Sequence, residues 1–218
     1  MNSIPLVITL LAASAVPPPA VPQEELRINF PPVPLASGAH PIAIPHNKDE
    51  SRDYLSPKIL VPKGVKNLAL NKKVTSSDPA PIIGELSLIT DGEKEADEGY
   101  EVELASGSQW VQIDLEKSAT IYAVAVWHFH RQKRSYKAVT IQISDDPAFK
   151  TGVKTIFNTD TANINKQGIG TDQGYLETNL GRLIEAKGGI QGRYVRLYSA
   201  GSSATSGNHY IEVEVYGK

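Results

Sequence analysis

The fold is decided by Trp110–Leu115 (WVQIDL) and Thr120–Phe129 (TIYAVAVWHF), two runs that stand four residues apart. In the first run Val111, Ile113 and Leu115 alternate with polar residues, which is the period of a strand with one buried face. In the second run apolar residues occupy both parities, which predicts a central strand covered on both sides.

The same alternation recurs in Val139–Ser144 (VTIQIS), Arg193–Tyr198 (RYVRLY) and Ile211–Tyr216 (IEVEVY). Clusters of Gly, Asn, Asp and Ser separate these runs, and no window of about 11 residues shows a 3.6-residue period. Residues 63–218 are therefore predicted to form one all-β domain, a sandwich or a barrel, with little helix.

Composition excludes several classes of protein. The 218 residues contain no Cys, so disulfide scaffolds, Cys-ligated zinc or iron–sulfur sites and thiol nucleophiles are ruled out. Lys and Arg number 22 against 24 Asp and Glu, for a formal net charge of -2. This balance lacks the basic excess that binds phosphate backbones, so nucleic acid is not an expected partner.

The N-terminal quarter differs from the rest. Ile4–Leu11 is a short apolar run followed by Ala13-Ser14-Ala15, which predicts a signal peptide over residues 1–15, the alternative being a disordered apolar tail. We expect a secreted or extracytoplasmic protein, in the periplasm or at the cell surface, whose mature chain does not span a membrane. Eleven of the 15 prolines lie between positions 17 and 62, so residues 16–62 are predicted to be an irregular, Pro-rich tether. Within it, Leu26–Phe30 alternates like a strand and Tyr54–Val61 is a second candidate for local attachment.

An ordered set of segments resembles a known family. The set is Asn67–Lys72, Ile89–Gly92, Trp110–Leu115, and Arg193–Leu197 followed by Ile211–Gly217. Together they resemble the factor V/VIII type C, or discoidin-like, domain of the galactose-binding-like fold. The resemblance implies a jelly-roll-like antiparallel β-sandwich, usually non-catalytic, with ligand loops at one end. Such domains most often bind carbohydrate, and some bind phospholipid or protein.

A structural metal is the second expectation. The loop Leu88–Asp97 is acidic and contains Gly, and Ca²⁺ prefers carboxylate and carbonyl oxygens. The resemblance implies as ligands the side chains of Asp91 and Glu212 and main-chain carbonyls nearby. Where the family commonly has Thr or Ser, this chain has Ala96, with Asp97 as an alternative ligand; an ordinary Asp-Gly turn with solvated acids is the other interpretation. The main-chain carbonyls that would complete the metal site belong to Leu88, Glu93, Ala96 and Ile211.

The candidate ligand residues come from two segments. Trp127–Arg134 ends the central strand, and Ser199–Tyr210 precedes the last one. Sugars are bound by planar hydrogen-bonding groups and by aromatic faces. Alternatives remain open: His128 as a buried histidine, Trp127 as a core residue, and the arginines as a solvated strand end. The predicted ligand set is Trp127, His128, His130, Arg131, Arg134, Asn208, His209 and Tyr210.

These features predict an exported, non-catalytic module that recognises a glycan or polysaccharide and is steadied by calcium. The alternative is a structural or protein-interaction module, for example in adhesion. An enzyme is not expected, because the sequence has no Gly-x-Ser-x-Gly motif and a small sandwich rarely encloses a deep cleft.

Overall fold

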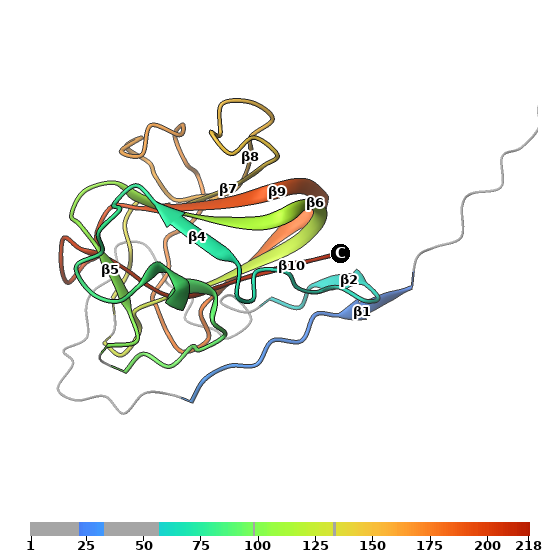
Figure 1. Ribbon diagram of the computed structural model, residues 1–218, viewed down its shortest axis with the longest axis horizontal. Coiled ribbons are helices and arrows are strands. Elements are labelled where there is room, and N and C mark those ends of the chain that lie inside the picture. The colour runs from blue at the N-terminus through green and yellow to red at the C-terminus, as the bar shows by residue number, and fades with distance from the viewer. Residues whose placement is uncertain (1–21, 33–56, 98, 133) are drawn as a thin grey trace, which may run out of the picture.

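The computed structural model describes residues 22–32, 57–97, 99–132 and 134–218 (Figure 1). The predicted signal peptide and most of the predicted tether lie outside these ranges. Every strand pairing in the described chain is antiparallel, and its one helix is a short 3-10 turn. The elements are β1 (Gln23–Glu25), β2 (Leu60–Pro62), β3 (Lys66–Asn67), β4 (Lys73–Ser76), η1 (Leu86–Thr90), β5 (Val102–Leu104), β6 (Gln109–His128), β7 (Thr140–Ser144), β8 (Lys154–Asn158), β9 (Arg182–Ser199) and β10 (Asn208–Gly217).

Two long strands, β6 and β9, run through both layers of a sandwich. Their register shifts between Asp114 and Ala119 of β6, where the Glu116 backbone has a positive φ. Before the shift β6 pairs with β4 and with the end of β9; after it β6 pairs with β10 and with the start of β9. Irregularities of this kind bend a strand. The bend turns one hydrogen-bonded sheet into two facing layers, which confirms the predicted all-β sandwich.

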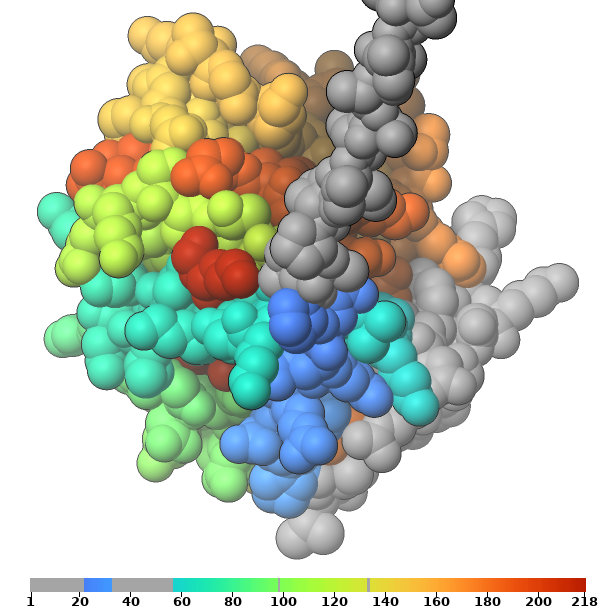
Figure 2. All heavy atoms as spheres, turned by 90° about the vertical axis from the view of Figure 1, so that its right-hand side faces the viewer, coloured from blue at the N-terminus to red at the C-terminus, as the bar shows by residue number. Residues whose placement is uncertain are grey.

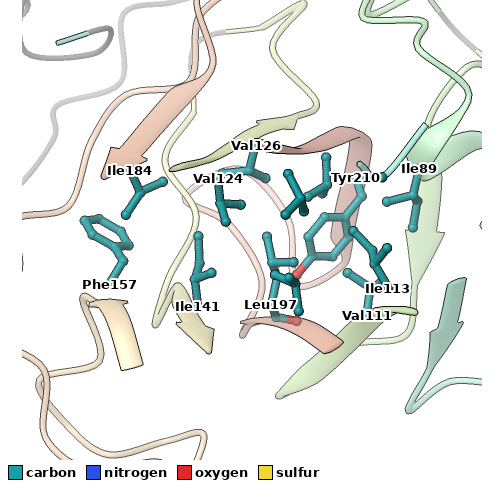
Figure 3. Packing of buried hydrophobic residues seen from close by; sticks show 14 of the residues in the cluster. Ile89, Val111, Ile113, Val124, Val126, Ile141, Phe157, Ile184, Leu197 and Tyr210 are labelled. Atoms are coloured by element: carbon teal, nitrogen blue, oxygen red, sulfur yellow. The ribbon is translucent and has the colours of Figure 1, made fainter. Parts of the chain in front are cut away.

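The main core fills the space between the layers. Val111 and Ile113 face it from one layer, and Val124 and Val126 face it from the other. Figure 3 shows Leu197 and Tyr210 among these side chains. The strand-like alternation read from the sequence is therefore confirmed, because each of these four aliphatic side chains is fully buried.

A second core lies on the outer face of the β10–β6–β9 layer. Ala123, Ala125 and Trp127 of β6 project into it, so the central strand is covered on both sides, as its sequence predicts. The cover comes from the N-terminal arm, defined here as residues 22–32, and from residues 57–62. The arm contributes Leu26, Ile28 and Phe30, and β1 pairs with β2. Figure 2 shows the blue arm lying against the chain that follows residue 57.

Polar contacts fix the arm as well. The Leu26 amide donates to the Ile59 carbonyl at 2.9 Å, and Lys94 Nζ donates to the Asn29 carbonyl at 2.9 Å. Residues 22–32 are thus attached to the domain along their length, by more than the brief strand pairing that their sequence indicates. No helix in the described chain has the length and hydropathy of a membrane span.

Shortening an arm side chain tests this attachment. Ile28→Ala is expected to lower the free energy of unfolding by about 1–2 kcal/mol, because Ile28 is half-buried against the second core. The neighbouring control Arg27→Ala removes an exposed side chain and should change stability by less than about 0.5 kcal/mol. Thermal melting of both variants measures the difference, and equal melting temperatures would show that the arm contributes nothing.

Candidate functional site

Loops from several strands meet at the end of the sandwich where β5 starts, β6 ends and β10 starts. In register, His209 of β10 lies opposite Glu103 of β5, and Tyr210 lies opposite both Val102 and His128. We call this end the rim. Its loops are formed by the described residues 77–85, 91–97, 99–101, 129–132, 134–139 and 200–207, and most predicted ligand residues lie in or beside them.

Beneath the rim lies a buried polar layer. His128 Nδ1 is 2.6 Å from Glu177 Oε1, and neither side chain is exposed to solvent. The His128 ring stacks on Tyr136 at 4.3 Å between centroids and is tilted against Tyr210 at 4.8 Å. The Glu177 amide also donates to the Arg134 carbonyl at 2.8 Å. His128 therefore supports the rim from below and presents no face to a ligand, in line with the buried alternative.

Neither aromatic residue of the predicted ligand set, Trp127 or Tyr210, is open to solvent. Trp127 is fully buried, its Nε1 donates to the Asn179 carbonyl at 3.0 Å, and Lys94 Nζ lies 4.8 Å from its ring centroid. Gly181, at φ +61°, packs so closely that a Cβ there would come within 2.6 Å of the indole. Tyr210 is fully buried as well, with its hydroxyl 3.1 Å from Ser199 Oγ. Both rings are core residues in this structure, because elements distant in sequence close over them.

Asn208 holds a loop in place. Its Oδ1 accepts hydrogen bonds from Ser199 Oγ at 2.8 Å and from the Gly201 amide at 2.7 Å. Its Nδ2 donates to the carbonyls of Ala105 and Gly107 at 2.8 and 2.9 Å. Two donor hydrogens and two acceptor lone pairs are the full capacity of a side-chain amide. Asn208 has none left for a sugar, so it positions the 200–207 loop.

Three other rim residues keep unused hydrogen-bonding atoms. Among the described residues His130 Nε2, Arg134 Nε and His209 Nδ1 are buried and have no partner. His130 Nδ1 lies 3.1 Å from the His128 carbonyl, which needs a donor, so the neutral ring leaves Nε2 as an acceptor. Buried polar atoms without partners are rare, and a cluster of them indicates a site for a polar ligand or ordered water.

Burial keeps both rim histidines neutral. It lowers the pKa of His130 below the ordinary value, and it lowers the pKa of His209 to about 4, with the charges of Arg134 and His128 acting in the same direction. His209 Nε2 is 3.5 Å from Glu103 Oε1. A neutral imidazole can both donate and accept, which suits it to sugar hydroxyls.

The structure adds rim residues that the sequence did not single out as ligand contacts. Tyr100 is 52% exposed, and Arg131 Nη1 lies 3.2 Å from Asp97 Oδ1 on the same loop edge. Glu103 and Phe129 complete the cluster, with Phe129 under the Arg134 guanidinium at 4.7 Å. The sequence pattern predicted a metal loop over Leu88–Asp97 and assigned no role to Tyr100 just after it, although an aromatic residue in a Gly-containing loop is a usable signal.

The predicted metal loop, Leu88–Asp97, overlaps the rim from residue 91 and contacts the arm through Lys94, whose Nζ donates to the Asn29 carbonyl. Glu212 is fully buried; its Oε2 accepts from the Gly92 amide at 3.3 Å, and its Oε1 has no partner among the described residues. Burial raises the pKa of Glu212 to about 9, and the nearby charges of Glu214 and Asp91 add to the rise. Lys94 pairs with Glu214 at 2.7 Å, and its charge offsets only part of the rise in the Glu212 pKa.

This arrangement fits a hard cation, because a buried carboxylate oxygen without a partner lies next to the Asp91–Gly92 turn. Within the described chain no three His, Asp or Glu side chains form a metal cluster. A cation would therefore have two carboxylates and rely on carbonyl oxygens for the rest, as Ca²⁺ sites allow. The predicted carbonyl donors stand at Leu88 in η1, at Glu93, at the buried Ala96 and at Ile211 in β10.

Comparison with known proteins agrees with this architecture. The family model for the NedA-like galactose-binding domain, of the F5/8 type C group, matches residues 88–197, about half of the chain. The chain belongs to this family. A search of curated proteins finds no match.

Solved structures support the same assignment. The galactose-binding domain is similar to chitosan-binding module 1 of a chitosanase/glucanase from Paenibacillus sp. IK-5, with 26% identity, a TM-score of 0.50 and coverage of 70% of this chain and 99% of that module. A family 89 glycoside hydrolase from Clostridium perfringens shares the fold alone, at 14% identity and a TM-score of 0.51, over 70% of this chain and 14% of that chain.

The histidine at the rim gives the domain a pH dependence. An unfolded chain protonates His209 near pH 6.5, whereas the folded domain does so near pH 4. Between these values the unfolded state binds more protons, so stability falls as the pH falls from 6.5 to 4. His209→Gln is expected to remove up to about 3 kcal/mol of this loss. Urea unfolding of both proteins at pH 7 and pH 4.5 measures the loss of stability in each. An equal loss in the two proteins would contradict a neutral, buried His209 imidazole.

Proposed function

We propose that this chain is a non-catalytic carbohydrate-binding module whose ligand site is the rim. The observation that carries the proposal is the convergence of unused polar atoms of His130, Arg134 and His209 at the ligand end of a galactose-binding domain. Neutral imidazoles and a guanidinium are planar groups of the kind that hydrogen-bond sugar hydroxyls. The exposed Tyr100 ring offers an aromatic face beside them.

The comparisons support the carbohydrate class. The similar structure from Paenibacillus is named a chitosan-binding module, a name that describes binding and not catalysis. The polar groups stand on loops that meet at one end of the sandwich, an arrangement that suits recognition of a ligand at the surface. Single shallow sites bind weakly, so several copies on one surface would raise the avidity.

A protein ligand is the second candidate. Ile82 and Ile83 are 65% and 37% exposed on the loop after β4, and Ile83 bridges to Glu103 beside the rim. Adjacent exposed aliphatic side chains are typical of protein contacts. In that case the module would act in adhesion or in an extracellular assembly.

We also propose that Ca²⁺ binds beside Glu212. The side chains of Asp91 and Glu212 would hold it, together with carbonyls of the 88–96 loop and of Ile211. The ion would neutralise a buried carboxylate and tie the loop to β10, which stabilises the domain. Export through residues 1–15 remains part of the proposal, supported by the apolar run and the Ala-Ser-Ala sequence that follows it.

Sugar binding is tested on a glycan array and then by titration calorimetry. We expect saturable binding, weakened about threefold to tenfold by His130→Ala, because one hydrogen bond to a sugar hydroxyl is lost. The control Lys154→Ala removes an exposed side chain of β8, away from the rim, and should bind like the parent. If the folded protein bound no glycan on the array but captured a protein partner, the second candidate would be supported.

Calcium binding is tested by thermal melting with and without a chelator. Saturating Ca²⁺ is expected to raise the melting temperature by about 5 °C or more, since a ligand at 100 times its Kd adds about 2.7 kcal/mol. Glu212→Gln should abolish the rise, whereas the exposed control Glu185→Gln should keep it. Equal melting temperatures in EDTA and in Ca²⁺ would contradict the proposed metal site.

A further inference from the structure

Arg134 is a buried cation at the rim without an acidic partner. Its side chain is 5% exposed, and it forms no ion pair with any carboxylate of the described residues. Its contacts are neutral: Nη2 donates to Gln132 Oε1 at 3.0 Å, and the guanidinium lies on the Phe129 ring at 4.7 Å. A buried charge without a countercharge is costly, so proteins rarely retain one without a use for it.

The acidic groups nearby are committed elsewhere. Glu177 is 2.6 Å from His128 in the layer below, and Asp97 pairs with Arg131. Glu103 faces His209. Asp97 and Glu103 thus have partners of their own, and Glu177 contacts His128 through Oε1 while its Oε2 has no partner among the described residues. None of the three carboxylates lies within ion-pair distance of Arg134.

A tyrosinate does not supply the missing charge either. Burial raises the pKa of Tyr136 far above its ordinary value, so its hydroxyl is neutral at any physiological pH. The buried Arg134 guanidinium therefore has no anionic group of the described residues in contact with it.

We propose that Arg134 binds a carboxylate on the sugar, so that the ligand of this module is an acidic, uronate-containing glycan. The proposal rests on the carbohydrate-binding function argued above. A guanidinium presents parallel N–H donors that match a planar carboxylate, and Phe129 beneath it fixes the plane in which they lie. His130 Nε2 would then accept from a hydroxyl of the same sugar.

Paired oligosaccharides test the proposal. Oligomers of galacturonate, glucuronate and mannuronate are titrated into the domain by calorimetry, each beside its methyl ester, together with neutral galactose and glucosamine oligomers. We expect at least one uronate oligomer to bind about tenfold or more tightly than its ester, because the charge-assisted pair with Arg134 is lost on esterification. Arg134→Gln should remove the preference and Arg134→Lys should keep part of it, whereas Arg27→Gln on the arm should leave it unchanged.

A second readout works on the parent protein, in case Arg134→Gln does not fold. Because the contact with Arg134 would be ionic, raising the salt concentration should weaken the binding of a uronate and leave the binding of its neutral ester unchanged. Equal affinity for acid and ester, with the same dependence on salt, would overturn this inference and leave the carbohydrate function standing. Binding of no sugar of either class would overturn both.

Discussion

The architecture depends on the pairing of β6 with β9. These strands hydrogen-bond along nearly their whole length, and both pass from one layer to the other at the bulge around Glu116. Since each layer is built on half of this pair, the inner faces of the two layers are held at the spacing that the main core fills. The same pair carries the end of β6 to the rim, so the positions of His128 and His130 follow directly from strand geometry.

Electrostatics divides the domain into two unlike sites. Beneath the rim, the His128–Glu177 pair is closed between aromatic rings, and the unpaired groups above it are cationic or neutral. Beside the arm, Glu212 is a buried carboxyl group without a countercharge, and burial raises its pKa to about 9. Burial has opposite consequences at the two places, because a guanidinium needs an anion and a carboxylate needs a cation or a proton. The proposed polar ligand at one site and the proposed metal ion at the other would satisfy both needs.

The sequence predicted the fold well because strand alternation is a local signal. The buried Val111 and Ile113, and the two-sided run around Val124, follow from period-two patterns alone. The ligand residues were harder to predict, because contacts between segments distant in sequence decide which side chains are buried. Trp127 is closed off by Gly181 and Asn179, and Asn208 is saturated by carbonyls about a hundred positions earlier. Local sequence singled out segments that the structure brings together at the rim, but it could not show which of their side chains face outward.

The most direct measurement of the central claim, that the rim meets the sugar, is an amide chemical-shift map of the labelled domain during titration with an oligouronate. The account predicts that the largest shifts fall on Tyr100, Glu103, His130, Arg134 and His209, with the arm and strands β7 and β8 unaffected. Shifts centred on the outer face of β7 and β8, or on the arm, would place the ligand elsewhere and contradict it.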